Sequence, residues 1–430
     1  MRTRPMTRFR TTLLVLAGLL LAGASHAQLL PGVLPRLPQA AAPLSNTLDD
    51  VGGDVHRLSG ARALEIRALL RAHRRELDTD PHGAPVVRGE IIAIDPGVAA
   101  LQALRQAGFT VGTERVLDPL ALRVVALTAP QGRDTRAALA LARHTDPAGN
   151  YDFDHLFWRS ASPATAAAAS PVATGRRGGP AAPLRVGLVD SGVDDGHPAL
   201  AGTDVQHWGC DGQRVPDAHG TAVASLLAGR AVTGAAAGST LFAADVYCGQ
   251  ATGGTALAVA QALAWLSRER VGVVNISLVG PPNRLLERAV AAMQARGHLL
   301  VAAVGNDGPA AAPLYPAAYA GVIGVGAVNA RERVLPEAGR GPQVDFVAPG
   351  AGVIAAAPAG RWRAVRGTSY AAPLVARMAA QHMASPGTVQ MAAALSALEH
   401  AAVLPRGADA LAYGHGVVGL ALPLTRAPGN

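Results

Sequence analysis

From residue 184 onward, short apolar runs alternate with longer stretches that have the pattern of helices. The apolar runs are LRVGLVD (184–190), STLFAADVYC (239–248), VGVVNIS (271–277), LLVAAVG (299–305), GVIGVGAV (321–328) and VDFVAPG (344–350). The helical stretches that separate many of them are 219–230, 255–268, 283–296 and 369–384. Continuous apolar runs of this length are typical of strands buried on both faces. The pattern therefore predicts an α/β fold with a mainly parallel sheet between two helical layers.

A different pattern precedes it, between residues 86 and 157. Strand-like PVVRGEIIAI is followed by a helical stretch that ends at Gly108, and then by two strands separated by Asp118-Pro119. A second helix, with Asp134 as a candidate N-cap, leads into the alternating strand YDFDHLF. The order β-α-β-β-α-β predicts a small α+β domain of the ferredoxin-like kind. No group of candidate catalytic residues lies in it.

The first 27 residues have the pattern of an export signal. MRTRPMTRFR is basic, TTLLVLAGLLLAGA is a short apolar run, and SHAQ offers small residues for cleavage after Ala27. We therefore expect a periplasmic or extracellular protein. No later segment reaches 18 apolar residues without Gly, Pro or charge, so we expect no stable membrane span.

The remaining segments connect these parts. Residues 28–85 are rich in Pro and Gly at first and then contain a basic helical stretch, so this leader is expected to be partly disordered with one helix. Residues 158–183 are an Ala/Ser/Pro/Gly linker. The predicted domains are thus 86–157 and 184–430.

The net charge of +8 raises the question of a nucleic-acid partner. All 38 basic residues are arginine, and residues 1–180 carry 21 of them against 15 acidic groups. The larger C-terminal part is therefore nearly balanced, which makes a poor phosphate-binding surface. We expect no nucleic-acid partner.

Three candidate catalytic side chains lie where a parallel sheet collects its functional residues, at strand ends and helix starts. Asp190 ends a predicted strand, and His219 and Ser369 each begin a predicted helix. Taken singly, the aspartate fits a turn, the histidine a structural role and the serine an N-cap. The order of the three residues along the chain and the motifs around them are stronger evidence for a catalytic role.

The motifs around these residues resemble those of the subtilisin-like serine peptidases. They are VGLVDSGVDDGHPAL, HGTAVASLLAG, VNISLVGP, AAVGNDGP, YPAAYAGVIGVGAV, VDFVAPG and GTSYAAPLVA. The triad residues occur in the order Asp, His, Ser that is typical of subtilisin. The resemblance covers residues 184–420 and implies a three-layer α/β/α peptidase domain. It also implies that residues 86–157 are a pro-domain that inhibits the enzyme and assists its folding.

The resemblance implies a role for each site residue. Ser369 would be the nucleophile, His219 the general base and acid, and Asp190 the residue that orients the imidazole. Asn306 would donate its amide to the oxyanion. The segment Ser277, Leu278, Val279 and Gly280 would pair with the main chain of a polypeptide substrate. Leu314 stands at the wall of the primary specificity pocket, where its size favours small or medium apolar substrate residues; Asp307 at the rim favours a basic one instead.

The resemblance also concerns cysteines and metals. Cys210 and Cys248 would lie at one end of neighbouring strands and form a disulfide, with two buried free thiols as the alternative. No cofactor and no metal ligand is expected to be required. Structural calcium remains possible, but the segment GRAVTG (229–234) is shorter than the loop that holds the tight calcium site in relatives.

Two other functions compete with a secreted endopeptidase made as an inactive precursor. A catalytically silent relative would serve as a binding or scaffold protein, although it would have no need of all four of Asp190, His219, Ser369 and Asn306. A nucleotide-binding α/β domain is disfavoured because GLVDSG lacks the glycine pattern that a pyrophosphate requires.

Overall fold

The computed structural model describes residues 62–159 and 182–424, all within one compact unit. The expected export signal (1–27), the first part of the leader and most of the linker lie outside the described residues. Residues 62–72 are helical, and a turn then leads into β1 (Leu77–Thr79). The helix expected in the leader is therefore present, but the leader also contains a strand, which the sequence reading missed.

The next six elements have the predicted order β-α-β-β-α-β. They are β2 (Pro85–Ile94), α2 (Val98–Gln106), β3 (Thr110–Leu117), β4 (Leu122–Thr128), α3 (Thr135–Thr145) and β5 (Asn150–Arg159). The strands pair antiparallel in the order β5-β2-β4-β3, as in the ferredoxin-like arrangement. Asp134 caps α3 by accepting a hydrogen bond from the backbone of Ala137.

The second part of the chain contains a seven-stranded parallel sheet in the order β14-β13-β12-β10-β6-β8-β7. Its strands are β6 (Arg185–Asp190), β7 (Asp204–Trp208), β8 (Thr240–Asp245), β10 (Val273–Ile276), β12 (Leu299–Ala303), β13 (Ile323–Val328) and β14 (Phe346–Pro349). Each of the six apolar runs contains one strand of this sheet, and the run that contains β10 leads into the short strand β11 (Leu278–Val279).

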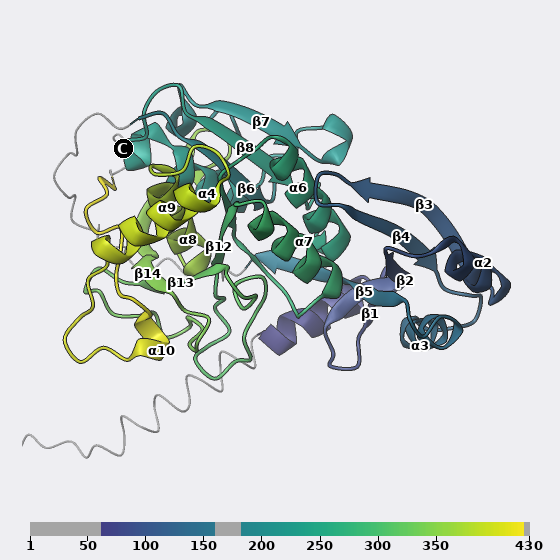
Figure 1. Cartoon of the computed structure of the whole chain (residues 1–430). Coiled ribbons are helices and arrows are strands. Elements are labelled where there is room, and N and C mark those ends of the chain that lie inside the picture. Colours follow the sequence, from purple (N-terminus) through teal and green to yellow (C-terminus); the bar gives the residue numbers. More distant parts are fainter. Residues whose placement is uncertain (1–61, 160–181, 425–430) are drawn as a thin grey trace, which may run out of the picture. The chain divides into compact units, whose positions relative to one another are not determined.

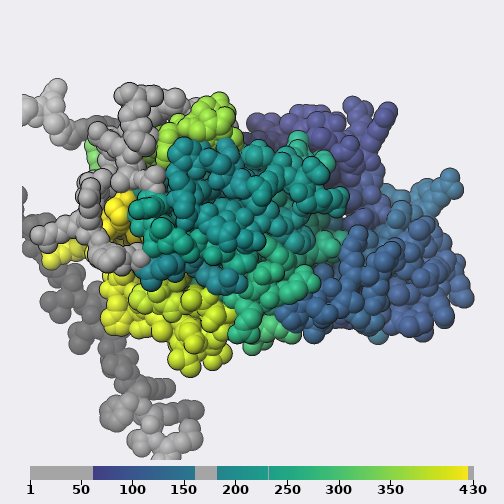
Figure 2. Space-filling view, turned by 90° about the horizontal axis from the view of Figure 1, so that it is seen from above, coloured from purple at the N-terminus to yellow at the C-terminus, as the bar shows by residue number. Residues whose placement is uncertain are grey.

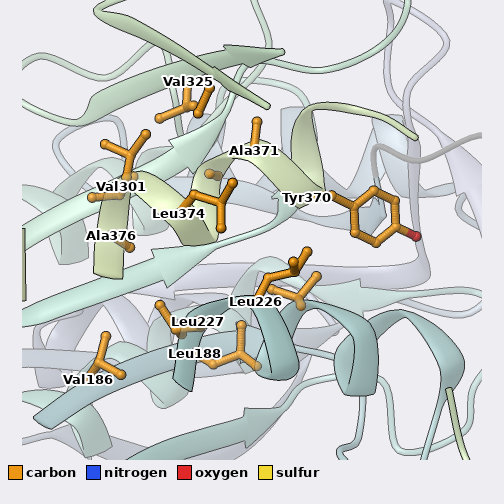
Figure 3. Packing of buried hydrophobic residues seen from close by; sticks show 14 of the residues in the cluster. Val186, Leu188, Leu226, Leu227, Val301, Val325, Tyr370, Ala371, Leu374 and Ala376 are labelled. Carbon is orange, nitrogen blue, oxygen red and sulfur yellow. The ribbon is translucent and has the colours of Figure 1, made fainter. Parts of the chain in front are cut away.

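Helices cover both faces of this sheet (Figure 1). One layer is formed by α4 (Ala218–Ala228), α8 (Thr368–Ala380) and α9 (Thr388–Ala401), and the other by α6 (Ala256–Arg268) and α7 (Arg284–Ala295). Successive strand residues point to opposite faces of the sheet. Leu188 packs in the hydrophobic core beneath the first helical layer, and Val189 packs in the core beneath the second. In Figure 3, Leu374 of α8 lies beside Val301 of β12. The three-layer α/β/α prediction is confirmed.

Smaller elements complete the fold. They are η1 (Pro198–Leu200), η2 (Cys210–Gly212), α5 (Arg230–Thr233), β9 (Gly254–Thr255), the hairpin β15 (Ala351–Ala357) and β16 (Arg361–Arg366), and α10 (Ala410–Tyr413). The C-terminal residues, yellow in Figure 2, form a continuous surface with teal and green residues of the sheet-bearing part. Among the described residues, no helix is long and apolar enough to cross a lipid bilayer.

A disulfide joins Cys210 to Cys248, as the resemblance implied. Cys210 lies in η2, just after β7, and Cys248 follows β8; because β7 and β8 pair in parallel, both cysteines lie at the same end of the sheet. The alternative of two free thiols is wrong for this structure, since neither of these cysteines is free.

Loss of this disulfide is expected to lower stability. The bond joins residues separated by 38 positions, for which restriction of the unfolded chain gives about 3–4 kcal/mol. The paired variant Cys210→Ser, Cys248→Ser should therefore unfold at lower urea concentration, with a free energy of unfolding smaller by about that amount. A matched variant with Ser396→Ala, on the exposed face of α9, serves as the control. Equal stability of the cysteine variant and the wild type would contradict this expectation.

Candidate active site

Asp190 is the last residue of β6 and is completely buried. Its Oδ1 accepts hydrogen bonds from the backbone N–H of Ser191 at 2.7 Å and the hydroxyl of Ser191 at 3.1 Å. The same oxygen lies 2.8 Å from Nδ1 of His219. A carboxylate held by two donors in this way keeps its position and fixes the ring that it touches.

His219 lies in the first turn of α4 and is 3% exposed. The helix begins here because Asp217 is its N-cap and accepts a hydrogen bond from the backbone N–H of His219 at 2.7 Å. Gly220 is required beside it, because a Cβ at that position would collide with the carbonyl group of Ser191. With Nδ1 directed at Asp190, the ring leaves Nε2 as the atom that can exchange a proton.

Ser369 lies in the first turn of α8, two residues after the N-cap Gly367, whose φ of 133° favours glycine. The hydroxyl of Ser369 donates to the carbonyl of Ser277 at 3.2 Å, and the Ser277 hydroxyl donates to the carbonyl of Ser369 at 3.0 Å. Within the described residues, Nε2 of His219 has no hydrogen-bond partner. Asp190 and His219 are thus in contact as predicted, whereas no hydrogen bond joins the serine to the imidazole. Catalytic hydrogen bonds are often long or misaligned before substrate binds.

Asn306 follows β12 and is 7% exposed. Its Oδ1 accepts a hydrogen bond from the backbone N–H of Thr368 at 3.1 Å, which ties it to the start of the nucleophile helix. Its Nδ2 is buried and has no partner in the part of the chain that the structure describes. A buried donor without an acceptor costs free energy, and a negatively charged oxygen bound beside Ser369 would satisfy it.

Two further carboxyl groups, those of Asp217 and Asp245, act electrostatically on each other and on the region of Asp190. Burial raises the pKa of Asp245, and the negative charges of Asp190 and Asp217 add to this effect. For Asp217, burial alone would raise the pKa, but hydrogen bonds from His219 and Ser191 and the positive charge of Arg159 outweigh it, so its pKa is lowered. Asp217 is therefore an ionised group at neutral pH, fixed two residues before the histidine.

The segment that was expected to bind substrate main chain forms the edge strand β11, next to Ser277. It pairs antiparallel with β5, with Leu278 opposite Arg159 and Val279 opposite Trp158. A second short strand, β9, pairs with the same strand β5 through Gly254 and Thr255. The last four residues of β5 therefore lie as an extended chain in a groove between β9 and β11. Of these, the side chain of Phe157 is fully buried.

Further contacts hold the N-terminal part at the site. Arg62 lies over the ring of Trp158, with 4.2 Å from its guanidinium carbon to the ring centroid, and pairs with Asp307 at 3.4 Å. Two carboxylates of β5 accept hydrogen bonds at helix starts: Asp154 from the backbone of Leu257 at 2.9 Å, and Asp152 from the backbone of Arg284 at 2.8 Å. Both bonds satisfy backbone N–H groups that a helix start leaves without an intrahelical acceptor.

Leu314 packs against Gly305, where its Cδ1 lies 2.6 Å from the position that a Cβ of that glycine would take. It therefore lies beside the Asn306 segment, and its effect on substrate preference stays a prediction. Sequence reading missed Asp217, Tyr247 and β9 as parts of the site. The signal for Asp217 was present in DAHG, an acidic residue two positions before the histidine, whereas Tyr247 lines the same cavity as His219 only through the folding of the chain.

The described residues contain a single group of three potential metal ligands, Cys210, Asp245 and Cys248. Because the two sulfurs form a disulfide, they cannot act as thiolate ligands. The connection from α4 to β8, residues 229–239, has no Asp, Glu, Asn or Gln side chain. It does not offer the side-chain oxygens that calcium prefers, so the residues do not fit a tight calcium site there. Calcium dependence stays a prediction.

Three features together define a subtilisin-type serine peptidase. They are a parallel sheet between two helical layers, a buried aspartate–histidine pair at the carboxyl end of β6, and a serine at a helix start. The model of the subtilase family matches residues 183–416, which is more than half of the chain. The chain therefore belongs to the subtilase family.

Individual relatives agree with this assignment. M-protease from Shouchella clausii (strain KSM-K16) is 38% identical over 167 residues, which cover 38% of this chain and 43% of M-protease. Subtilisin DY from Bacillus licheniformis is 29% identical over 249 residues, or 55% of this chain and 88% of subtilisin DY. Among solved structures, fervidolysin from Fervidobacterium pennivorans, a keratinolytic enzyme related to subtilisin, has a TM-score of 0.61 at 19% identity and covers 78% of this chain and 60% of fervidolysin. This last likeness supports the fold alone.

Proposed function

We propose that the protein is an exported serine endopeptidase that hydrolyses polypeptides through Asp190, His219 and Ser369 and is made as an inhibited precursor. The observation that carries the proposal is the buried 2.8 Å contact between Asp190 and Nδ1 of His219. It fixes the tautomer in which Nε2 is a base, and a base is what makes a serine hydroxyl nucleophilic.

The reaction follows from these positions. Ser369 Oγ attacks the carbonyl carbon of the substrate while its proton moves to Nε2 of His219. The carbonyl oxygen becomes negative and accepts hydrogen bonds from Asn306 Nδ2 and from the backbone N–H of Ser369. The protonated imidazole, stabilised by Asp190, then gives its proton to the leaving amine, and the C–N bond breaks. Water, activated by the same imidazole, releases the acyl group from Ser369.

Inhibition of the precursor is supported by the position of β5. The strand fills the groove between β9 and β11 in the extended form that a substrate would adopt, and pairing to an exposed edge strand is a common way to bind peptides. Arg62 and Trp158 of the N-terminal part line the same cavity as His219, so the N-terminal part also lies beside the base. Export is supported by residues 1–27, which have the pattern of a signal peptide. This pattern predicts that the protein is in the periplasm or outside the cell.

A serine-directed fluorophosphonate tests the proposal. The mature protein is expected to be labelled on Ser369 and to hydrolyse an unfolded polypeptide, whereas the full precursor should be labelled much more slowly. Digestion and mass measurement of the labelled protein identify the modified residue. A protein that folds but takes no label and cleaves nothing would instead fit the silent binding protein, the second function that the sequence left open.

Replacement of Asn306 by leucine is expected to lower kcat by about 100- to 1000-fold, with KM little changed. The amide nitrogen meets the oxygen only when it becomes negative, so its loss affects the transition state more than substrate binding. Initial rates on a fluorogenic peptide, normalised to the fraction of folded protein, measure this change. Asn329→Leu, in the turn that follows β13, is the matched control, and a rise in KM alone for Asn306→Leu would contradict the role.

A further inference from the structure

The register of β5 in the groove shows which substrate position each of its side chains represents. The carbonyl of Ser277 accepts a hydrogen bond from Oγ of Ser369, so the strand position opposite Ser277 lies beside the nucleophile. Leu278 is opposite Arg159 and β5 runs antiparallel, so Arg159 is one residue short of that position. In a bound substrate, the equivalent of Arg159 is the second residue before the bond that is cut.

Arg159 has a defined partner at this position. Its Nη1 lies 3.2 Å from Oδ1 of Asp217, and its guanidinium carbon lies 5.9 Å from the centre of the Tyr247 ring. In the described part of the chain, Arg159 is the only basic side chain that forms an ion pair with Asp217. An ionised carboxylate and an aromatic face together are well suited to a guanidinium or ammonium group.

Asp217 is held in place before any substrate arrives. Its Oδ1 accepts a hydrogen bond from the backbone N–H of His219 at 2.7 Å and lies 3.0 Å from the hydroxyl of Ser191, whose one proton it shares with Asp190. Both donors belong to the peptidase part and not to β5, so the carboxylate keeps its orientation when β5 leaves. A pre-positioned charge loses little conformational entropy when it binds a partner.

We propose that Asp217 is a specificity-determining residue, which selects substrates with arginine or lysine as the second residue before the cut. The inference rests on the proposed peptidase function and names a substrate class for that same site. Arg159 of the N-terminal part occupies the position in the precursor, and a basic side chain of the substrate takes its place in the mature enzyme. Because the pair is partly exposed, the selectivity falls as salt is added.

Three fluorogenic peptides test the proposal on the mature protein. The first is acetyl-Leu-Phe-Trp-Arg-Ser-aminocoumarin, which repeats the chain's own order at residues 156–160. In the second, citrulline replaces arginine and removes the charge at nearly constant shape; in the third, glutamate replaces it. Wild-type kcat/KM is expected to be about 10- to 100-fold higher for arginine than for citrulline, the range of a charge-assisted hydrogen bond, and lower again for glutamate.

The variant Asp217→Asn is expected to bring the arginine-to-citrulline ratio close to one. Asparagine is also a good N-cap, so α4 keeps its start. Because the readout is a ratio of two substrates on one variant, an overall loss of activity does not affect it. Asp307→Asn, which removes a carboxylate that pairs with Arg62 and not with Arg159, is the matched control and should keep the wild-type ratio.

The outcomes separate the two proposals. If wild-type protein is labelled by fluorophosphonate but cleaves the arginine and citrulline peptides equally, the specificity proposal is wrong and the peptidase function stands. If Asp217→Asn and Asp307→Asn reduce the ratio to the same extent, the preference comes from the general negative field and not from Asp217. If no label is taken and no peptide is cut, both proposals fail.

Discussion

Replacement of Ser369 by alanine is expected to reduce kcat/KM by about a millionfold, the size of the loss that the nucleophile gives in subtilisin, a member of the same family. The expected loss is this large because alanine leaves no atom that can form the acyl intermediate. Asn306 and the groove would still bind substrate, so a small rate above that of water is expected to remain. KM is expected to change little.

The measurement needs a folded and uncontaminated variant. Ser369→Ala and the control Ser396→Ala carry the same substitution, and Ser396 lies on the exposed face of α9. Both should show wild-type unfolding curves, while only Ser396→Ala takes the fluorophosphonate label. The Ser369→Ala precursor should also keep its N-terminal part attached if the enzyme cuts itself. Substantial peptide cleavage by a pure Ser369→Ala sample would mean that another residue is the nucleophile.

Sequence patterns predicted the layers of the fold because parallel strands that are buried on both faces appear in the sequence as continuous apolar runs. A strand such as VGVVNIS has no polar face to expose, and the strand β10 that it contains is completely buried. The same rule did not reveal the hairpin of β15 and β16, because in AGVIAAA and RWRAVR the larger apolar residues are few and are mixed with Ala, Gly and Arg. Their pairing depends on contacts with each other and with α4, which no local pattern records.

Part of the candidate site was also predictable. Asp190, His219 and Ser369 each lie at the end of a strand or the start of a helix, and a parallel sheet brings such ends together. The two residues that line the position of Arg159, Asp217 and Tyr247, were not identified. Tyr247 follows β8 while His219 starts α4, and only the assembled sheet brings them to one cavity. The sequence also does not show which residue of β11 lies opposite which residue of β5. The position of Arg159 relative to Ser369 could therefore be found only from the structure.

The Asp190→Asn variant is expected to lose about 10,000-fold in kcat, less than the nucleophile variant but more than Asn306→Leu. The carboxylate accepts the Nδ1 proton at 2.8 Å and leaves Nε2 as the base. An asparagine amide placed there can donate instead, which favours the other tautomer and puts the proton on Nε2. The imidazolium that forms during the reaction also loses its buried negative neighbour, so the transition state loses stabilisation that the ground state never had.

Measurements of kcat and of labelling across the neutral pH range separate this electrostatic role of Asp190 from a structural one. Asp190→Asn keeps the shape of the side chain and the hydrogen bond from the backbone of Ser191, so we expect a folded protein whose KM is near that of the wild type. Its kcat should be low across the neutral range, and fluorophosphonate labelling should slow by a similar factor, because both reactions need the base. Asp211→Asn, an exposed position after the disulfide cysteine, is the matched control. If Asp190→Asn were labelled at the wild-type rate, His219 would not depend on Asp190 for its tautomer, and the triad assignment would have to be abandoned.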